Sequence, residues 1–500
     1  MKLAQLLQGV RVTKLFQTMF GRMVVTHDVE VSAIQYDSRK ITRGDCFVAI
    51  RGTGVDGHRF ISTAISNGAS VVVLEDDAIL PDSYFMHAGV VKVVVPDSRK
   101  ALAQLATNYY DHPSKKLTLI GVTGTNGKTT TTHIIKSILE SSGETVGLIG
   151  TIEYAIGSTT FPATHTTPES LELNELLSRM VKAGCTSVSM EVSSHALHQS
   201  RVMGLAYRAA VFTNLTQDHL DYHGSMEEYC RAKKILFDGL TAEASAVINQ
   251  DDSWGLKIVQ DSPAQKVMYS ATGEATVSAR DIKLSIEGSV MAMVHNGQAT
   301  TVTSPLVGRF NVDNILAAFS TGIALGLSPE VIRQGIGSLK AVRGRFERIT
   351  SPKGWTAIVD YAHTPDALEK CLHAIRDVLP KRAEGKIITV FGAGGDRDKT
   401  KRPLMGAVAG SLSDVVLVTS DNPRTEDPGA IIRDIVGGIP GGTTILQEPD
   451  RRKAIEQAIS MARAGDVVLI AGKGHEDYQV IGTERIHFSD QEVVRELAQS

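Results

Sequence analysis

A glycine-rich segment at residues 121–130, with the sequence GVTGTNGKTT, has residue types suited to binding phosphate groups. It lies between the apolar run LTLIGV and an amphipathic run, where a strand would lead into a helix. Glycines let backbone N–H groups approach phosphate oxygens, and the helix N-terminus adds a favourable dipole. Lys128 can reach the β- and γ-phosphates of a nucleotide, and the Thr129 hydroxyl can bind Mg²⁺. The segment therefore predicts a nucleotide site.

The spacing of this segment departs from the strict phosphate-loop motif. Valine stands at position 122, where the motif has its first glycine, and glycines stand at 121 and 124 instead. The alternative is a glycine-rich turn that carries a surface lysine. The GKTT sequence at a strand-to-helix junction favours phosphate binding.

Two further polar segments follow apolar runs and carry candidate metal ligands. The segment EVSSH follows TSVSM, and NLTQDHLDYHG follows AAVFT. Mg²⁺ prefers oxygen ligands and combines one or two carboxylates with substrate phosphates, so Glu191 is a candidate ligand. His219 and His223 are four residues apart, which on a helix could suggest zinc and in a loop would suit capping residues. The phosphate loop favours magnesium.

Four polar motifs follow apolar runs in the last third of the chain. The runs TAIVD, IITVF, DVVLVT and DVVLIA have the composition of buried strands. They lead into YAHTPDA, GAGGDRDKTKRP, SDNPRTEDP and GKGHEDY. Ligands of open α/β sheets bind outside the carboxyl ends of the strands. A second site is therefore predicted where these four motifs meet.

The strands and helices expected around these motifs are those of an α/β protein. A length of 500 residues and three blocks of sequence predict three domains. Residues 1–110 mix short strands, at 46–50 and 70–74, with a helix at 99–110. Residues 111–340 alternate strand and helix, as in a parallel-sheet ATPase domain of the phosphate-loop type. Residues 341–500 repeat this alternation and predict a Rossmann-like α/β domain.

Within the middle block, three features make specific predictions. In the run 128–143, Ile134, Ile135, Ile138 and Leu139 form one apolar helix face, and Gly143 suits the helix end. Thr167 as N-cap and Pro168 at the first helical position predict a second helix. Residues 265–305 are rich in β-branched residues and predict an antiparallel insertion.

The composition is that of an ordinary globular protein, with 42% hydrophobic and 21% charged residues. A formal net charge of −3, without a Lys/Arg-dense stretch, argues against nucleic acid as a partner. The four cysteines are scattered without a CxxC pair, which favours a reducing compartment. No run approaches the roughly 18 apolar residues that span a bilayer, and the N-terminus has no signal-type apolar segment. We therefore expect a cytoplasmic protein without membrane insertion.

Nine segments, in this order, carry a family resemblance: GTNGKTT, MEVSSHAL, FTNLTQDHLDYHG, GRFNVDN, RGRFE, VDYAHTPDAL, GAGGDRDKTKRPLM, SDNPRTEDP and AGKGHEDY. Together they resemble the Mur ligases, and among these the UDP-N-acetylmuramoyl-tripeptide synthetases, from residue 37 to residue 490. The resemblance implies an ATP-dependent ligase of peptidoglycan precursor synthesis that acts as a monomer. It would add meso-2,6-diaminopimelate to UDP-N-acetylmuramoyl-L-alanyl-D-glutamate through an acyl phosphate.

The resemblance also implies the nucleotide and metal residues. ATP would be bound by Gly124, Thr125, Asn126, Gly127, Lys128, Thr129, Thr130, Asn311, Arg345, Asp360 and His363. Mg²⁺ would lie near Thr129, Glu191 and His219, and the catalytic residues would be Lys128, Glu191, His219 and Lys233. Lys233 would be carbamylated by CO₂, with Lys234 beside it as the competing position. By pattern alone, either lysine suits a solvated helix face.

The remaining implied residues bind the two other substrates. The UDP-linked dipeptide would be held by Ser38, Thr166, Thr167, Ser193, Gln199 and Arg201. Diaminopimelate would be held by Arg397, Asp421, Asn422, Pro423, Arg424, Gly472 and Glu476. A guanidinium at 424 can hold the second carboxylate of diaminopimelate, which lysine lacks, and Glu476 suits an ammonium group. Alternatively, Asn-Pro-Arg is only a turn, although a turn does not require the arginine.

Three other functions remain open from the sequence. The same ligation could use L-lysine in place of diaminopimelate. A ligase resembling folylpolyglutamate synthetase would share the phosphate loop but would lack the DNPR and GKGHE segments. A non-catalytic, ATP-gated binding protein would have no use for Glu191, His219 and Lys233 together.

Overall fold

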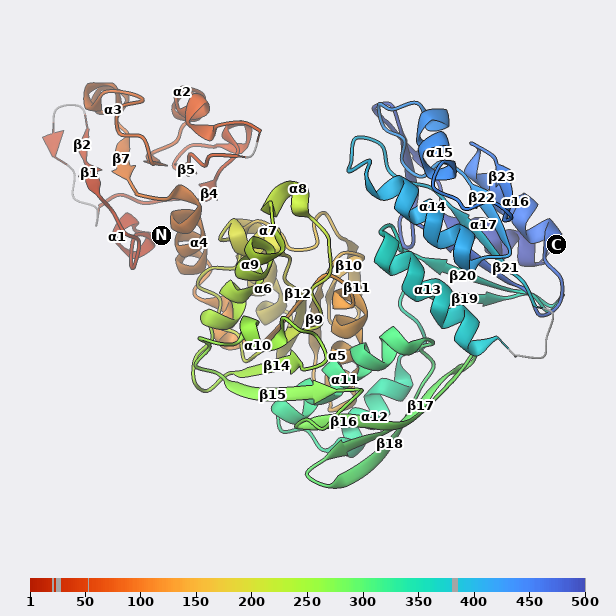
Figure 1. Ribbon diagram of the computed structural model, residues 1–500. Coiled ribbons are helices and arrows are strands. Elements are labelled where there is room, and N and C mark those ends of the chain that lie inside the picture. Colours follow the sequence, from red (N-terminus) through yellow and green to blue (C-terminus); the bar gives the residue numbers. More distant parts are fainter. Residues whose placement is uncertain (20–21, 24–27, 53, 380–384, 500) are drawn as a thin grey trace.

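The computed structural model describes residues 1–19, 22–23, 28–52, 54–379 and 385–499. Within these residues the chain forms sheets of five, eleven and six strands and two further two-stranded sheets. Figure 1 shows three groups of elements, red to orange, orange through yellow to green, and teal to blue, each built around one large sheet. Each large sheet falls inside one of the three predicted blocks, and the block boundaries themselves stay a prediction. None of the helices in the described ranges is both long and apolar enough to cross a membrane.

The N-terminal sheet has the strand order β1-β7-β6-β5-β4, and only β1 runs antiparallel to its neighbour. The strands are β1 (Lys14–Phe16), β4 (Ile34–Gln35), β5 (Cys46–Val48), β6 (Val71–Leu74) and β7 (Val91–Val94). The helices are α1 (Leu3–Leu6), α2 (Ile61–Ser66), α3 (Asp82–Ala88) and α4 (Ser98–Tyr109), with η1 (Ser38–Lys40), η2 (Gly57–Phe60) and η3 (Pro113–Lys116). A small hairpin joins β2 (Thr18–Met19) to β3 (Arg22–Met23). The strands and helix predicted here are thus confirmed to within about two residues.

The middle sheet has the order β11-β10-β9-β12-β8-β13-β14-β15-β16-β17-β18. Its predicted parallel strands are β8 (Thr118–Thr123), β9 (Val146–Ile149), β12 (Ser187–Glu191), β13 (Ala209–Phe212) and β14 (Ser245–Asn249). They pair in parallel and are almost entirely buried, as continuous apolar runs require. A hairpin of β10 (Glu153–Ile156) and β11 (Thr159–Pro162) adds to one edge.

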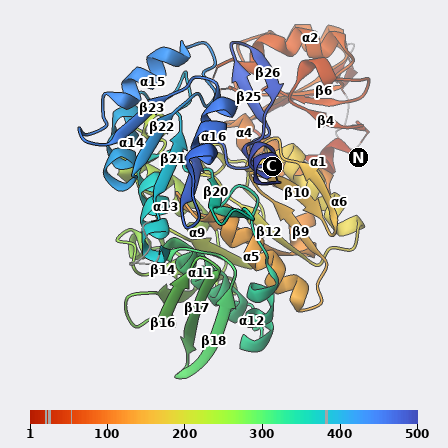
Figure 2. The ribbon, with the colours of Figure 1, turned by 90° about the vertical axis from the view of Figure 1, so that its right-hand side faces the viewer.

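The predicted antiparallel insertion is only partly correct. Strand β15 (Gln265–Ser270) runs parallel to β14, so it continues the main sheet. The strands β16 (Val277–Ser285), β17 (Gly288–His295) and β18 (Gln298–Ser304) are antiparallel to one another and extend the same sheet. Figure 2 shows these three strands at the lower end of the molecule. The β-branched composition predicted the strands, but pairing partners depend on where the chain returns to the sheet.

The helices of the middle part are α5 (Lys128–Ser141), α6 (Ser170–Lys182), α7 (Ser194–His198), α8 (Leu220–His223), α9 (Met226–Asp238), α10 (Gly255–Ile258), α11 (Arg309–Ala324) and α12 (Pro329–Ser338). The apolar face predicted for α5 is buried, and Gly143 follows the helix with a φ of +90°. The predicted start of α6 is wrong. Its N-cap is Glu169, two residues after Thr167. The Thr167 hydroxyl instead donates to the Glu191 carbonyl at 2.9 Å and accepts from the Ser193 N–H at 3.1 Å.

The C-terminal sheet has the order β19-β20-β24-β21-β22-β23, with only β19 antiparallel. Its strands are β19 (Glu347–Thr350), β20 (Thr356–Asp360), β21 (Ile387–Phe391), β22 (Val415–Val418), β23 (Thr444–Gln447) and β24 (Val467–Ala471), and a hairpin of β25 (Tyr478–Ile481) and β26 (Glu484–His487) follows. The helices are α13 (Pro365–Val378), α14 (Lys401–Leu412), α15 (Pro428–Val436), α16 (Arg451–Met461) and α17 (Asp490–Gln499). The four strands predicted to end in polar motifs are neighbours, so the motifs share one edge.

A buried ion pair fixes the ends of two of these strands. Arg451 and Asp490 are fully buried, and two guanidinium nitrogens meet the two carboxylate oxygens at 2.8 Å each. The same guanidinium donates to the carbonyls of Ser420, at 3.3 Å, and Ala471, at 3.0 Å. These carbonyls lie where β22 and β24 lead into SDNPRTEDP and GKGHEDY. The pair therefore anchors both motifs to α16 and α17.

We predict that Arg451→Met destabilises the C-terminal sheet by about 3–5 kcal/mol, because it leaves the Asp490 charge buried without a partner. Hydrogen exchange of the β24 amides measures this locally, which suits a chain of several domains. Arg333→Ala, which breaks an exposed pair with Glu330, is the control and should leave β24 protection unchanged. Equal protection in Arg451→Met and the wild type would contradict the anchoring role.

Candidate active site

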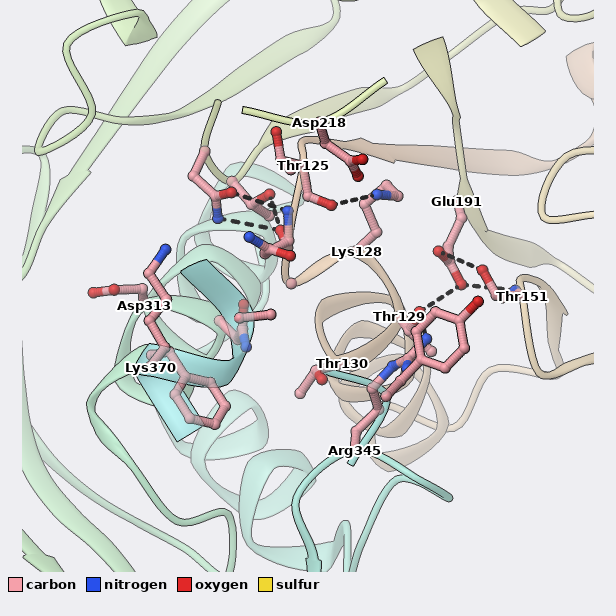
Figure 3. A pocket seen from close by; sticks show the side chains of 18 of the residues that line it. Thr125, Lys128, Thr129, Thr130, Thr151, Glu191, Asp218, Asp313, Arg345 and Lys370 are labelled. Carbon is pink, nitrogen blue, oxygen red and sulfur yellow. Dashed lines mark hydrogen bonds between the residues drawn. The ribbon is translucent and has the colours of Figure 1, made fainter. Parts of the chain in front are cut away.

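A cavity of about 360 Å³ lies where the phosphate loop faces the C-terminal sheet. Figure 3 shows side chains from both parts pointing into it. Fourteen of the residues predicted from the sequence line this cavity: Thr125, Asn126, Gly127, Lys128, Thr129, Thr130, Thr166, Glu191, Ser193, His219, Lys233, Arg345, Asp360 and His363. Residues far apart in the sequence thus meet around one space.

The phosphate loop is held tightly against the neighbouring chain. Gly124 and Gly127 have φ values of +155° and +86°, which glycine adopts readily. A Cβ at Gly124 would lie 1.9 Å from the Thr213 hydroxyl oxygen, and one at Gly127 would lie 2.2 Å from Asn314 Oδ1. The Thr125 N–H donates to the Asn214 carbonyl at 2.8 Å. The loop backbone is therefore fixed at the N-terminus of α5, which is the arrangement that binds phosphate.

Two lysine ammonium groups meet at the carbonyl of Gly124. Lys128 Nζ donates to this carbonyl and to that of Thr125, both at 2.8 Å, and Lys233 Nζ donates to it at 2.9 Å. Lys233 is 1% exposed, so it does not belong to a solvated helix face. Burial lowers the pKa of Lys128, and burial together with the Lys128 charge lowers the pKa of Lys233 well below its usual value. Lys234 turns away and pairs with acidic side chains.

Oxygen donors suited to magnesium gather around Glu191. Its carboxylate is fully buried and accepts from the Thr129 hydroxyl at 3.0 Å and from the N–H of Thr151 at 2.8 Å. Within the residues that the structure describes, no group of three or more His, Cys, Asp or Glu is arranged to hold a metal. Magnesium does not require such a group, because one carboxylate, a hydroxyl and substrate phosphates supply its oxygen ligands. The donors therefore fit Mg²⁺ bound together with a nucleotide.

The histidine pair considered for zinc does not share a helix face. His219 precedes the four-residue helix α8 with a φ of +54°, whereas His223 ends it and lies 3.0 Å from the Ser194 hydroxyl oxygen. His219 lines the cavity, where burial lowers its pKa to about 4 against the opposing effect of Asp218. Its imidazole is therefore neutral near pH 7, which is the form that binds a metal.

Asn311, which was predicted to bind ATP, does not line the cavity. Its side chain is buried beneath the surface, where it donates to the Val307 carbonyl at 2.8 Å and accepts from Asn314 Nδ2 at 3.0 Å. Asn314 and Asp313, on the next turn of α11, do line the cavity. Figure 3 shows Asp313 beside Lys370, on the opposite side of the cavity from Glu191. The motif GRFNVDN thus reaches the cavity through residues that were not predicted.

The C-terminal part contributes one wall of the cavity. The Arg345 guanidinium lies 4.6 Å from the ring centre of Tyr361 and donates to the Thr129 hydroxyl at 3.3 Å. Asp360 accepts from the N–H groups of Phe346, at 2.6 Å, and Ala362, at 2.8 Å, and burial raises its pKa. Asp360 therefore shapes the loop around Arg345.

A single carboxylate joins this wall to the phosphate loop. Asp366 Oδ2 accepts from Asn126 Nδ2 at 3.0 Å and from the Thr216 hydroxyl at 3.3 Å, both in the middle part of the chain. The same oxygen accepts from Lys370 Nζ at 2.9 Å, on the same helix as Asp366. Asp366 therefore ties α13 to the loop at the cavity.

The residues predicted for the UDP-linked dipeptide are divided between two places. Thr166 and Ser193 line the cavity, while Arg201 donates to the Thr167 carbonyl at 3.1 Å and to Gln199 Oε1 at 2.6 Å. The sixth residue, Ser38, lies in η1 of the N-terminal part and is not among the residues that line the cavity.

The residues predicted for the amino acid come together at the edge of the C-terminal sheet. Asn422 Nδ2 donates to Glu476 Oε2 at 2.9 Å, and Arg424 Nη1 donates to the Gly395 carbonyl at 2.7 Å. A Cβ at Gly472 would lie 2.7 Å from Asp421 Oδ2, and one at Gly394 would lie 3.0 Å from Arg424 Nη1 and 3.8 Å from Arg397 Cγ. Arg424 has a φ of +51°, and its N–H bonds the Val480 carbonyl at 3.1 Å, so Pro423 and Arg424 turn the chain against β25.

Several residues at these sites were missed by sequence reasoning. Asp218, Tyr361, Asp366 and Lys473 lie inside segments that were recognised, so a signal for them was present. Thr151 had no such signal, because only the turn after β9 brings it to Glu191.

Comparison with protein families matches three models along the chain. Residues 30–110 match the model "Mur ligase family, catalytic domain". Residues 122–322 match "Mur ligase middle domain", and residues 344–474 match "Mur ligase, glutamate ligase domain". The three matches follow the order of the three sheets.

Curated relatives resemble the chain over nearly its whole length. A protein of Gloeobacter violaceus, named UDP-N-acetylmuramoyl-L-alanyl-D-glutamate–2,6-diaminopimelate ligase, is 48% identical and covers 94% of both chains. A protein of the same name from Parabacteroides distasonis is 46% identical over 94% of this chain and 95% of its own.

Solved structures show the same fold. One with that ligase name has a TM-score of 0.69 at 33% identity and covers 97% of this chain and 99% of its own. A folylpolyglutamate synthase of Mycobacterium tuberculosis has a TM-score of 0.63 at 17% identity, over 75% of this chain and 92% of its own. The second likeness is one of fold alone.

We predict that Asp366→Ala weakens binding of a non-hydrolysable ATP analogue roughly 10-fold, because the phosphate-loop residue Asn126 loses a charged partner. Calorimetric titration measures the Kd. Asp377→Ala removes an exposed carboxylate from the same helix and should leave the Kd unchanged. Unchanged affinity in Asp366→Ala would show that this contact does not support the nucleotide site.

Proposed function

The chain belongs to the Mur ligase family, and we propose that it joins meso-2,6-diaminopimelate to UDP-N-acetylmuramoyl-L-alanyl-D-glutamate in peptidoglycan precursor synthesis. It is an ATP-dependent ligase that forms an amide bond. The observation that carries the choice of amino acid is that Arg424, which donates to the Gly395 carbonyl, lies at the same sheet edge as the hydrogen-bonded pair Asn422 and Glu476. This edge offers a cation for a carboxylate next to an anion for an ammonium group.

The nucleotide cavity supports the first half of the reaction. A carboxylate oxygen of the dipeptide attacks the γ-phosphorus of ATP, ADP leaves, and an acyl phosphate forms. Lys128 and Arg345 supply positive charge where the phosphoryl group would pass. Mg²⁺ held near Thr129, Glu191 and His219 would neutralise phosphate charge during this transfer.

The residues predicted for the amino acid, at the edge of the C-terminal sheet and here called the amino-acid pocket, support the second half. The amino nitrogen of diaminopimelate attacks the acyl carbon, its proton is lost, and phosphate leaves as the amide forms. Binding the far end of the amino acid at Arg424 and Glu476 would hold the attacking nitrogen in place, which lowers the entropic cost of the attack. We assign Arg397, Asp421, Asn422, Pro423 and Gly472 to the same pocket, and Ser38, Thr166, Thr167, Ser193, Gln199 and Arg201 to the UDP-linked dipeptide.

L-lysine fits this pocket less well than diaminopimelate does. Its side chain ends in an ammonium group without a carboxylate, so Arg424 would gain no partner and would repel it. A folylpolyglutamate synthetase-like ligase shares the fold but would not need the DNPR and GKGHE segments. The cytoplasm, the monomeric state and the absence of nucleic-acid partners stay predictions.

We also propose that Lys233 is carbamylated. Its amine is buried beside Lys128, and burial together with the Lys128 charge lowers its pKa well below the usual value, which favours the unprotonated form. The unprotonated nitrogen would attack the carbon of CO₂, lose a proton and become an anionic carbamate. That anion would remove the repulsion between the two ammonium groups at Gly124.

We predict that Lys233→Ala lowers kcat about 100-fold or more, since it removes a charged group next to the transferring phosphoryl group. Acetate or formate at high concentration should restore part of the activity by occupying the anionic position. Lys234→Ala should keep the wild-type kcat, because Lys234 pairs with Asp238 and Asp261 outside the cavity. Full activity of Lys233→Ala, or no rescue by either acid, would contradict the carbamate.

We predict that Arg424→Ala lowers kcat/KM for diaminopimelate roughly 10- to 100-fold, because a hydrogen bond to a charged group is worth about 1.5–3 kcal/mol. The KM for ATP should scarcely change, and L-lysine should remain a poor substrate. Steady-state kinetics with both amino acids, at saturating ATP and dipeptide, measure this.

The control for Arg424 is Arg433→Ala, which removes an exposed guanidinium of α15 and should match the wild type. Unchanged diaminopimelate kinetics in Arg424→Ala would reduce this segment to a structural turn. A wild-type enzyme that ligates L-lysine faster than diaminopimelate would overturn the proposed substrate.

A further inference from the structure

Lys473 is a buried cation among the residues of the amino-acid pocket, and neither half of the proposed reaction uses it. It lies between Gly472 and Gly474, directly after β24, and its side chain is fully buried. Lysine is almost never fully buried unless it is paired, because removing an ammonium group from water is costly. Its partners therefore define what it does.

Three of the residues assigned to diaminopimelate surround this ammonium group. Lys473 Nζ donates to Asn422 Oδ1 at 3.3 Å and to Glu476 Oε2 at 3.2 Å, and it lies 3.8 Å from Asp421 Oδ1. The ring centre of Tyr478 lies 5.4 Å away. Lys473 belongs to the GKGHE segment and is buried, so it links this segment to the DNPR segment from the protein interior.

These contacts fix which way the Asn422 amide points. Its Oδ1 accepts from Lys473 and from the Val480 N–H at 2.9 Å, so its Nδ2 is directed to Glu476 Oε2 at 2.9 Å. Glu476 Oε2 then receives two donors, one from the amide and one from the ammonium group. The carboxylate is held in place before any substrate arrives, which is the condition for precise binding.

Lys473 also sets the charge of the pocket. Around this ammonium group, Asp421 and Glu476 bring two negative charges and Lys473 brings one positive charge, so this acidic side of the pocket keeps one negative charge. Arg397 and Arg424 lie outside this count. Arg451 does not alter this balance, because Asp490 neutralises it. One ammonium group from a ligand would restore neutrality on this acidic side, and Arg424 at the same sheet edge would meet one carboxylate. An amino-acid head that carries one ammonium and one carboxylate group has this charge pattern.

We propose that Lys473 is a positioning residue for amino-acid selection, which presets Asn422 and Glu476 and leaves the acidic side of the pocket, at Asp421 and Glu476, one ammonium group short of neutrality. This proposal rests on the proposed function, because it assumes that the pocket binds the incoming amino acid. Lys473 acts through Asn422 and Glu476.

Diaminopimelate and L-lysine are first compared as substrates of the wild-type enzyme. That comparison tests the proposed function by itself. The full-length Lys473→Met variant is then tested with whichever amino acid the wild type ligates faster. The KM for the amino acid should rise roughly 10- to 100-fold, since the variant leaves buried carboxylates without a cation. The KM values for ATP and the dipeptide should not change.

Hydroxylamine separates positioning from general damage. It attacks the acyl carbon of the acyl phosphate, phosphate leaves, and a hydroxamate forms without use of the amino-acid pocket. Lys473→Met should keep most of the wild-type rate of hydroxamate formation. A damaged C-terminal part would lower this rate too, because Arg345 and Tyr361 line the nucleotide cavity. An equal loss of hydroxamate and peptide products overturns the proposal.

Lys92→Met is the matched control for loss of a buried lysine. Lys92 is fully buried and pairs with Asp77 and Asp82 in the N-terminal part. Both variants should melt at a lower temperature than the wild type, but only Lys473→Met should change the KM for the amino acid. An unchanged KM in Lys473→Met overturns the proposal.

The double variant Lys473→Met, Glu476→Gln keeps the net charge of the wild-type pocket and covers the case in which Lys473→Met fails to fold. If Lys473 acts through Glu476, the double variant should raise the KM no more than Glu476→Gln does alone. If Lys473→Met raises the KM for the amino acid in the Glu476→Gln variant as much as it does in the wild type, the two residues act independently and the proposal is overturned.

Discussion

The site depends on how two lysine side chains are accommodated at the carbonyl of Gly124. Lys128 and Lys233 both donate to it from buried positions, and two like charges so close in a poorly solvated region repel strongly. An unprotonated Lys233, or the proposed carbamate, would relieve that repulsion within the protein, and the phosphates of a nucleotide would relieve it from outside. The packing of Gly124 against Thr213 keeps this carbonyl in place, because a side chain at 124 does not fit.

The loop that carries Arg345 and the loop that carries His475 touch directly. Gly344 precedes Arg345, and a Cβ there would lie 2.1 Å from the His475 nitrogen. A Cβ at Gly474 would lie 2.6 Å from that of Tyr361, whose ring carries the Arg345 guanidinium. Close-packed contacts of this kind transmit small displacements. The segments around Arg345 and Tyr361 and the loop at Gly474 and His475 therefore hold each other in place. Asp366 links this part of the chain to the phosphate loop.

Much of the fold followed from local patterns, and the errors have identifiable causes. Continuous apolar runs predicted the parallel strands because strands buried on both faces need them. Thr167 and Pro168 have the residue types of a helix start, yet the Thr167 hydroxyl binds the end of β12, and Glu169 caps the helix. Strand β15 was predicted antiparallel, but its direction was set by the chain that precedes it.

The sequence by itself determined which residues can do chemistry: the phosphate loop, the acidic and histidine motifs, and the motifs at the strand ends. These depend on residue type and on neighbours along the chain, which a sequence displays. Only the tertiary structure decided that Asn311 supports Asn314 instead of facing the cavity, that Lys233 is buried whereas Lys234 is not, and that Lys473 stands behind Glu476. Those outcomes depend on burial and on distances between segments far apart in sequence, which no local pattern records.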